Sequence, residues 1–179
     1  MRAEMRREAL RLFLDKGFDA TTAGDIAAAV GTSARSFFRY FPTKEDVLVG
    51  ESIPFGTHVR DALTARPADE PIWPALRAAL DRLIDEMATD HQRSLDMMRV
   101  IMSTPALRAY HFEKHLAWED LLVPVVESRL NDGDALRART LAHSALACLD
   151  VALAEWVGLD GKPDLGALLD TVFATVAAL

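Results

Sequence analysis

The sequence predicts an all-α protein of about nine helices, in which a small N-terminal domain precedes a larger helical bundle. Two observations predict this fold. Apolar residues recur at the three- and four-residue spacing of helix faces, and no segment has the alternating pattern of a half-buried strand. The helical segments before residue 49 are short and those after Pro54 are longer, so we expect two domains, residues 1–48 and residues 49–179.

Caps and breakers divide the chain into its expected helices. Ser and Thr favour helix N-termini, Gly favours the position after a C-terminus, and Pro disfavours helix at the residue before it. Thr43 and Asp46 have the spacing of a capping box, with Asp in place of Glu. These signals predict helices at residues 2–16, 23–30, 34–40, 44–53, 75–89, 92–103, 106–130, 134–157 and 164–178.

Charge is distributed unevenly along the chain. The net charge of −7 excludes a protein that coats nucleic acid or anionic membrane indiscriminately, because such binding needs a positive surface. Residues 1–48 carry eight Lys or Arg against seven Asp or Glu, whereas residues 49–179 carry 12 against 20. Contacts with phosphate are therefore expected from the N-terminal quarter.

We expect a cytoplasmic protein with no membrane partner. Cys148 is the single cysteine and lies in an apolar stretch, so we expect a buried structural thiol rather than a disulfide or a redox sensor. The N-terminus is too charged for a secretory signal, and no stretch approaches 18 uninterrupted apolar residues.

Residues 22–40 have the layout of a helix-turn-helix motif, whose second helix enters the major groove of DNA. Ile26 and Val30 on the first helix can pack against Phe37 on the second, and Gly31 relieves the backbone at the turn. Many helical hairpins share these features, so this layout alone is a weak signal.

A longer string of residues is more specific. It reads Gly17-Phe18-x-Ala20-Thr21-Thr22-x-x-Asp25-Ile26-Ala27, then Gly31-x-Ser33, then Phe37-Phe38-Arg39-Tyr40-Phe41-Pro42-x-Lys44-Glu45. In this order and at nearly these spacings it resembles the N-terminal signature of the tetracycline-repressor (TetR) family. The resemblance covers residues 6–48. It implies a DNA-binding regulator with a helical C-terminal domain that houses a ligand pocket and pairs through its last two helices.

The resemblance and the chemistry of the side chains give eight candidate DNA contacts. Arg35 lies on the leading turn of the second helix, where it could pair with guanine or contact a phosphate, and both roles stay open. Thr22 can contact a phosphate, cap its helix, or do both. Tyr40 and Lys44 match family positions that grip the phosphate backbone. The candidates are Thr22, Ser33, Arg35, Ser36, Phe38, Arg39, Tyr40 and Lys44.

The first expected helix begins almost at Met1. It leaves no basic N-terminal arm of the kind that some members of the family insert into the minor groove. Either the protein lacks this readout, or an arm has been removed.

Bulky and polarisable residues between about 55 and 122 suit an adaptable cavity for a largely apolar small molecule. Individually each is more often a core residue, so the inference concerns the region. The candidate ligand contacts are Phe55, Trp73, Met87, Met98, Met102, Tyr110, His111 and Trp118.

Two apolar stripes on the last two expected helices are candidates for a homodimer interface. The alternative is that both stripes pack within one chain. The candidates are Leu141, Ala145, Leu149, Ala152, Trp156, Leu168, Leu169, Val172, Phe173 and Val176.

Neither a metal, a cofactor nor a catalytic site is predicted. His111 and His115 are four residues apart on one expected helix, a spacing that can bind a metal, but no third ligand lies nearby in sequence. Partly exposed surface histidines are therefore expected. No phosphate-binding glycine loop, nucleophile elbow or paired-carboxylate arrangement occurs, so an enzyme is not expected.

The sequence thus favours a ligand-responsive repressor that binds a palindromic operator in double-stranded DNA as a homodimer. A ligand-responsive activator or an architectural DNA binder of the same fold is the alternative. A helical ligand-binding module that does not bind DNA is the third reading.

Overall fold

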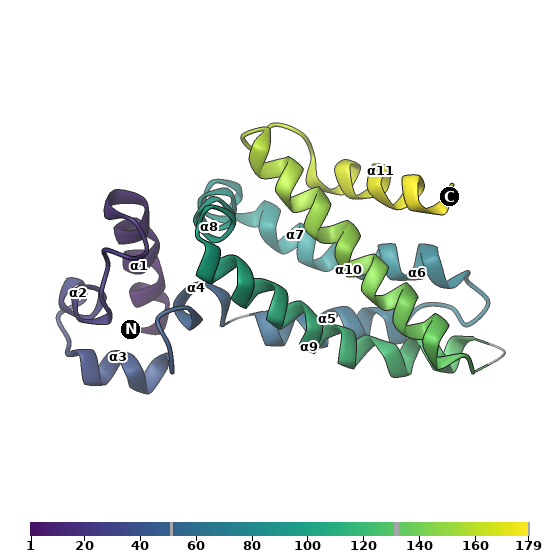
Figure 1. Ribbon diagram of the computed structural model, residues 1–179, viewed down its shortest axis with the longest axis horizontal. Helices are drawn as coiled ribbons and strands as arrows, with labels where there is room; N and C mark the ends of the chain where they lie inside the picture. The colour runs from purple at the N-terminus through teal and green to yellow at the C-terminus, as the bar shows by residue number, and fades with distance from the viewer. Residues whose placement is uncertain (51, 131–132, 179) are drawn as a thin grey trace. The chain divides into compact units, whose positions relative to one another are not determined.

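A computed structural model describes residues 1–50, 52–130 and 133–178. These residues form helices joined by turns, with no strand among them, which confirms the all-α prediction. The helices (Figure 1) are α1 (Arg2–Lys16), α2 (Ala23–Ala29), α3 (Ala34–Tyr40), α4 (Asp46–Val49), α5 (Ser52–Thr64), α6 (Ile72–Ala79), α7 (Asp81–Thr89), α8 (His91–Ser103), α9 (Pro105–Arg129), α10 (Ala135–Gly158) and α11 (Leu165–Ala177).

The chain divides into two compact units. The first comprises Met1–Ser52 and Asp96–Phe112, and the second comprises Ile53–Leu95 and Glu113–Leu179. Helices α8 and α9 therefore each begin in one unit and end in the other.

A small core organises α1, α2 and α3 in the first unit. Met5 of α1, Ile26 of α2 and Phe37 of α3 are fully buried, as is Phe41 at the C-cap of α3. The rings of Phe37 and Phe41 lie 5.3 Å apart between centroids. The expected turn between α2 and α3 is present, and its Gly31 has a φ of +69°, a conformation that disfavours residues with a Cβ.

Two expected helices differ from those that the structure contains. The segment expected as one helix over 44–53 is instead the short α4 followed by the start of α5, a helix that the sequence signals did not predict. Pro54 looked like a breaker, but it lies in the first turn of α5, where the missing N–H would have no helical partner. The segment expected over 75–89 is α6 and α7, which meet at Leu80 without any Gly or Pro.

The second unit is built around α10 and α11. Helix α10 contributes nine buried residues and packs against α11 and α6. Trp73 of α6 joins this contact, because its ring lies 4.5 Å from that of Phe173 and its Nε1 donates to the Phe173 carbonyl oxygen at 3.1 Å. Cys148 is buried as expected, and burial raises the pKa of its thiol, which opposes thiolate chemistry.

By length and composition alone, α10 could cross a membrane. Core helices pass the same test, and α10 packs on both α6 and α11. We therefore assign α10 to the core.

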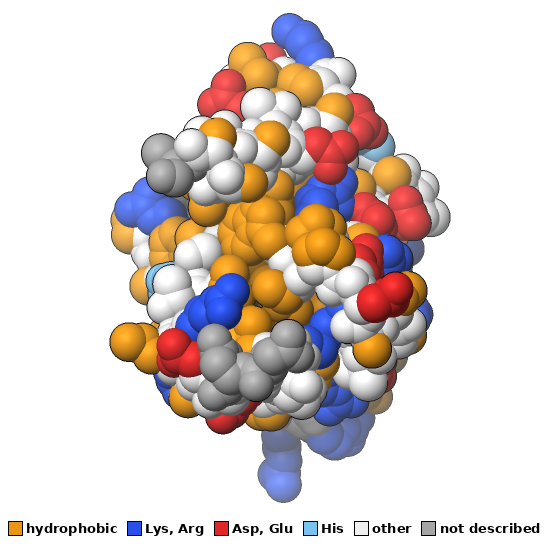
Figure 2. Space-filling view, turned by 90° about the vertical axis from the view of Figure 1, so that its right-hand side faces the viewer, with side chains coloured by type: hydrophobic (Ala, Val, Ile, Leu, Met, Phe, Trp, Pro, Cys, Tyr) orange, Lys and Arg blue, Asp and Glu red, His pale blue; other side chains and the backbone are white. Residues whose placement is uncertain are grey.

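Figure 2 shows a face of the second unit on which hydrophobic side chains gather in a hollow. Lys, Arg, Asp and Glu side chains surround it. An apolar hollow of this kind is a better binding surface for an apolar ligand than for water.

Substitution of Gly56 tests the contact between α5 and α9. A Cβ at Gly56 would lie 2.4 Å from Cδ1 of Trp118, which is closer than packing allows. We expect Gly56→Ala to lower the free energy of unfolding by about 1–3 kcal/mol, because one helix must move or the indole must leave its rotamer. Urea unfolding followed by circular dichroism measures the change.

Gly24→Ala is the matched control. Gly24 lies in α2, its φ is not positive, and the nearest atom to an added Cβ would be 3.5 Å away. We expect no loss of stability and a gain of up to about 1 kcal/mol. Equal effects of the two substitutions would contradict the close helix contact.

Candidate nucleic-acid interface and ligand site

Thr22 caps the N-terminus of α2. Its Oγ1 accepts a hydrogen bond from the Asp25 backbone N–H at 3.1 Å, and the Asp25 carboxylate accepts from the Thr22 backbone N–H at 2.9 Å. The Thr22 N–H and, next, its hydroxyl hold the pKa of Asp25 below its ordinary value. The structure therefore shows the capping role of Thr22, and a phosphate contact by the same exposed residue remains a prediction.

One side of α3 is buried and the opposite side is exposed to solvent. Ser33 is its N-cap and accepts a hydrogen bond from the Ser36 backbone N–H at 3.2 Å. Phe37 is fully buried, whereas Arg35 is exposed and Phe38 is 51% exposed. The anchoring of Phe37 thus turns candidate DNA contacts of α3 toward solvent.

Two further candidates interact at the end of α3. The Arg39 guanidinium lies 5.1 Å from the centroid of the Tyr40 ring, and its Nη2 donates to the Tyr40 hydroxyl at 3.5 Å. Arg39 is exposed and Tyr40 half-buried, so both polar ends lie near the surface.

Lys44 has a structural role that the sequence did not indicate. Its Nζ donates to the carbonyl oxygens of Phe18 at 2.8 Å and Thr21 at 3.0 Å, and it lies 3.9 Å from the centroid of the Phe18 ring. These partners are 23 and 26 residues away, so no local motif announces them. Lys44 ties the chain that leaves α3 to the turn between α1 and α2.

Thr43 and Asp46 make the reciprocal hydrogen bonds of the predicted capping box, but the box lies in the turn before α4, whose own N-cap residue is Glu45. Asp46 Oδ2 accepts from the Thr43 backbone N–H at 3.1 Å and from its hydroxyl at 2.9 Å, while the Asp46 N–H donates to Thr43 Oγ1 at 3.2 Å. The other oxygen, Oδ1, accepts from the hydroxyl of Tyr110 in α9 at 2.7 Å. The sequence had suggested Tyr110 as a ligand contact and did not connect it with Asp46.

The candidate ligand contacts fall in both units. Met98, Met102, Tyr110 and His111 belong to the first unit, and Phe55, Trp73, Met87 and Trp118 belong to the second. Met98, His111 and Trp118 are buried, and the other five are half-buried. The structure therefore does not gather all eight into one described cavity.

Trp118 is the candidate with an unsatisfied polar atom. It is 3% exposed, and its buried Nε1 has no hydrogen-bond partner among the described residues. Gly56 brings the α5 backbone against the indole, and the His115 ring lies 4.8 Å away between centroids. A buried N–H without an acceptor costs about 1–3 kcal/mol, which a ligand acceptor could recover.

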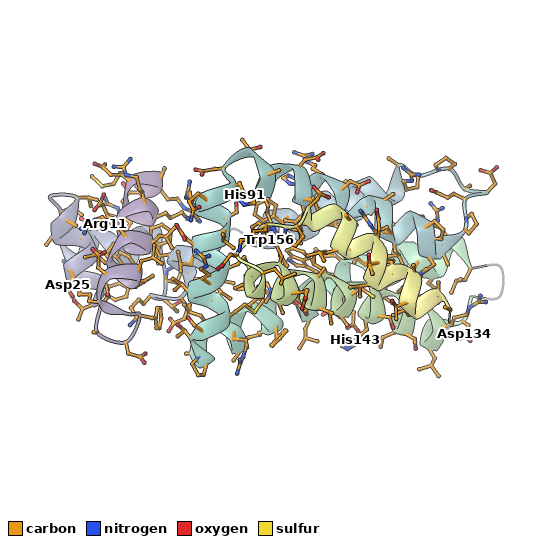
Figure 3. The ribbon with its side chains drawn as sticks, turned by 90° about the horizontal axis from the view of Figure 1, so that it is seen from above. Arg11, Asp25, His91, Asp134, His143 and Trp156 are labelled. Atoms are coloured by element: carbon orange, nitrogen blue, oxygen red, sulfur yellow. The ribbon has the colours of Figure 1, made fainter. Side chains whose placement is uncertain are left out.

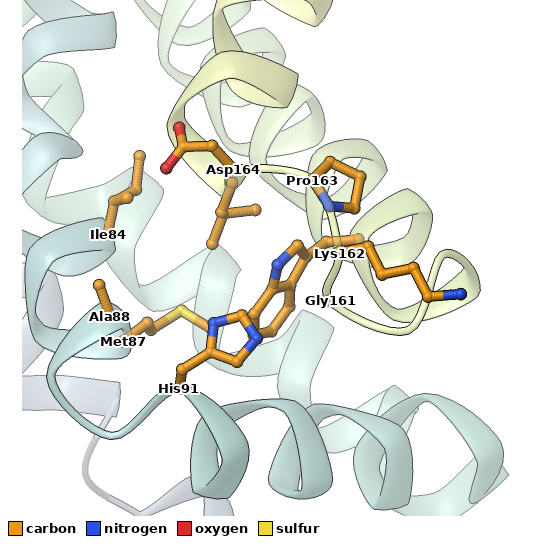
Figure 4. A pocket seen from close by; sticks show the side chains of 10 residues that line it. Ile84, Met87, Ala88, His91, Gly161, Lys162, Pro163 and Asp164 are labelled. Carbon is orange, nitrogen blue, oxygen red and sulfur yellow. The ribbon is translucent and has the colours of Figure 1, made fainter.

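A pocket of about 290 Å³ opens in the second unit (Figure 4). Its walls include the His91 and Trp156 side chains, which meet edge to face at 5.2 Å between centroids and lie together in Figure 3. Of the residues predicted to contact a ligand, Met87 lines this pocket. The lining residues are Ile84, Met87, Ala88, His91, Trp156, Gly161, Lys162, Pro163, Asp164 and Leu165.

The histidines expected at the surface are buried. His111 is 7% and His115 6% exposed, so the expectation of partly exposed side chains was wrong. His115 Nδ1 lies 3.0 Å from the Asp150 carboxylate of α10. Sequence spacing on α9 could not reveal this partner, because the partner belongs to another helix.

A second carboxylate, Glu119, also lies between α9 and α10. It is buried and faces His143 Nδ1 at 2.7 Å and Arg139 Nη1 at 3.3 Å. His143 itself is exposed and lies on the outside of the bundle in Figure 3. His115 and Glu119 of α9 therefore each make a polar side-chain contact with α10.

Most candidate dimer contacts lie inside the chain's own core. Ala145, Leu149, Ala152, Trp156, Leu169 and Phe173 are at most 4% exposed, Leu141, Leu168 and Val172 are half-buried, and Val176 is 38% exposed. The exposed apolar residues on these helices also include Val151, which the sequence stripe had left out. Small residues pack equally well within a chain and between chains, so the stripe could not distinguish the two.

Comparisons with known proteins agree with this layout. Residues 6–49 match the family model for bacterial regulatory proteins of the tetR family, and residues 70–179 match that for the MftR C-terminal domain. The HTH-type transcriptional regulator TcmR of Streptomyces glaucescens is 34% identical over 175 residues, which cover 93% of this chain and 77% of TcmR. The chain is a TetR-family transcriptional regulator.

Two solved structures share the fold of this TetR-family regulator. FadR from Bacillus subtilis, in complex with stearoyl-CoA, has a TM-score of 0.67 and 19% identity, over 97% of this chain and 96% of FadR. FadR from Thermus thermophilus, in complex with lauroyl-CoA, has a TM-score of 0.58 and 24% identity, over 97% of this chain and 92% of FadR. At these identities the likeness supports the fold alone.

Substitution of Lys44 tests its structural role in the regulator. Lys44→Met removes two hydrogen bonds to carbonyl oxygens, so we expect the free energy of unfolding to fall by about 1–3 kcal/mol. Lys16→Met is the control, because Lys16 makes an exposed ion pair with Asp25 at 3.5 Å. That change should cost less than about 1 kcal/mol in urea unfolding. Equal stabilities of the Lys44→Met variant and the wild type would contradict the assignment.

Proposed function

We propose that the regulator is a ligand-responsive repressor that binds a palindromic operator as a homodimer. The observation that carries the proposal is the exposed side of α3, which presents Arg35 and Phe38 beside the Ser33 cap while Phe37 is buried. Seven residues reach few base pairs, so two copies related by a two-fold axis would read two half-sites in register. An activator with the same fold remains the second candidate.

The dimer is proposed to form through the exposed sides of α10 and α11. Val151 is 56% and Val176 38% exposed, and the half-buried Leu168 and Val172 extend the apolar surface on α11. Pairing of such surfaces from two copies would complete a four-helix contact. The deeply buried members of the original stripe support these helices from within.

We propose an effector with an apolar body and a hydrogen-bond acceptor. The buried indole of Trp118 favours an apolar body, and its Nε1, which has no hydrogen-bond partner among the described residues, favours an acceptor such as a carbonyl oxygen. Acyl-CoA molecules, which occupy both FadR structures, combine these two features. Because Gly56 covers the indole, such a ligand would have to move α5 away from α9. A movement of this kind can couple ligand binding to DNA binding, with a typical coupling of about 1–3 kcal/mol.

Arg35 tests the base-reading part of the proposal. We expect Arg35→Ala to weaken operator binding by about 1–3 kcal/mol and to relax sequence preference at one position of each half-site. Fluorescence anisotropy on operators that differ at each position measures both effects. A uniform loss across all sequences would assign Arg35 to phosphate, and unchanged binding would remove it from the interface.

Trp118 tests the effector part, with lauroyl-CoA as the probe. We expect wild-type protein to bind lauroyl-CoA and Trp118→Phe to bind it about tenfold more weakly, because the donor is lost. Trp73→Phe is the control, since the Trp73 N–H is already bonded to the Phe173 carbonyl. Calorimetric titration measures the affinities. Lack of binding by the wild type would contradict an acyl effector, and equal binding by Trp118→Phe would contradict the role of its N–H.

A further inference from the structure

The carboxylate of Asp46 connects two elements that have no link in sequence. Its Oδ2 belongs to the capping box with Thr43, and its Oδ1 accepts the hydrogen bond from the Tyr110 hydroxyl. Both Asp46 and Tyr110 are half-buried. A hydrogen bond from a hydroxyl to a carboxylate is stronger than one between neutral groups, and partial burial limits competition from water.

This carboxylate lies where the chain leaves the proposed recognition helix. Helix α3 ends at Tyr40, and Thr43 follows three residues later. Phe41, which lies between them, is fully buried, and Lys44, which follows Thr43, donates hydrogen bonds to the carbonyl oxygens of Phe18 and Thr21. The exit from α3 is therefore fixed at three points, and the third is the pair of Asp46 and Tyr110.

The third of these contacts, the hydrogen bond from Tyr110 to Asp46, differs from the other two because its donor belongs to α9. This helix is continuous from Pro105 to Arg129, so it starts in the unit that contains α3 and ends in the second unit. The hydroxyl of Tyr110 joins the backbone exit of α3 to a helix that also belongs to the proposed effector domain.

We propose that Tyr110 is a positioning residue for operator recognition, which acts through Asp46 and contacts neither a base nor a phosphate. Its hydroxyl holds the Asp46 carboxylate and, with it, the segment that sets the direction of α3. This inference rests on the proposed function, because it needs an operator that the wild type recognises. The role assigns Tyr110 to the DNA-binding machinery rather than to the ligand cavity.

The experiment uses the full chain and an operator selected by the wild type from random double-stranded DNA. Tyr110→Phe, Asp46→Asn and the double variant are compared by fluorescence anisotropy on operator and on random-sequence DNA. We expect Tyr110→Phe to raise the operator Kd about 3- to 10-fold, because part of the free energy of one charge-assisted hydrogen bond contributes to operator binding. The Kd for random DNA and the salt dependence should stay unchanged, since phosphate contacts are not removed.

The double variant shows whether the two residues act as a pair. Tyr110→Phe removes the donor of this hydrogen bond, and Asp46→Asn removes the negative charge of its acceptor. Both substitutions act on the same bond, so the double variant should lose less affinity than the sum of the two single losses. A general loss of folding would instead weaken binding to operator and random DNA together.

Tyr40→Phe is the matched control, since the chain has two tyrosines. Tyr40 is proposed to touch phosphate, so loss of its hydroxyl should weaken binding to operator and random DNA alike. A wild-type operator Kd for Tyr110→Phe, or additive effects in the double variant, would overturn the inference. If the wild type selects no sequence at all, the proposed function fails instead, and the two failures are thereby distinguished.

Discussion

The DNA-binding half of this regulator depends on the burial of one aromatic side chain in a helix of seven residues. Phe37 enters the core of the first unit beside Phe41, and this anchoring sets the rotation of α3 about its axis. Neighbouring residues in a helix point about 100° apart, so fixing Phe37 inside necessarily turns Arg35 and Phe38 outward. The same core fixes the chain that leaves α3, where Lys44 and Asp46 hold the exit by hydrogen bonds.

We propose that the second unit must remain stable while it accommodates a ligand. Helices α10 and α11 supply the core, whereas α5 and α9 meet at Gly56, and no described residue provides an acceptor for the Trp118 N–H. An unsatisfied donor is a local cost that a suitable ligand removes, so binding and rearrangement of α5 would favour each other. Through its hydrogen bond to Asp46, Tyr110 connects α9 to the segment that follows α3.

Local signals predicted much of this structure, and long-range contacts account for what they missed. The caps at Thr22 and Ser33 and the box at Thr43 involve residues three apart, so the sequence contains all of their information. Helix α5 was not predicted, because Pro54 marked the expected boundary between the short and the longer helices. Pro54 is tolerated in the first turn of α5, and Gly56 allows the close contact with Trp118, which is distant in sequence.

The candidate site shows the same division between local and distant information. The exposed and buried sides of α3 follow from the anchoring of Phe37, whereas the carbonyl partners of Lys44 and the Tyr110 bond to Asp46 join residues 23 to 64 positions apart. The most direct measurement of the central claim is selection of random double-stranded DNA by the wild-type protein, followed by sequencing. The account predicts enrichment of an inverted repeat with two identical half-sites about 10 base pairs apart, or a multiple of that spacing. No enrichment, or enrichment of a single unrepeated site, would contradict it.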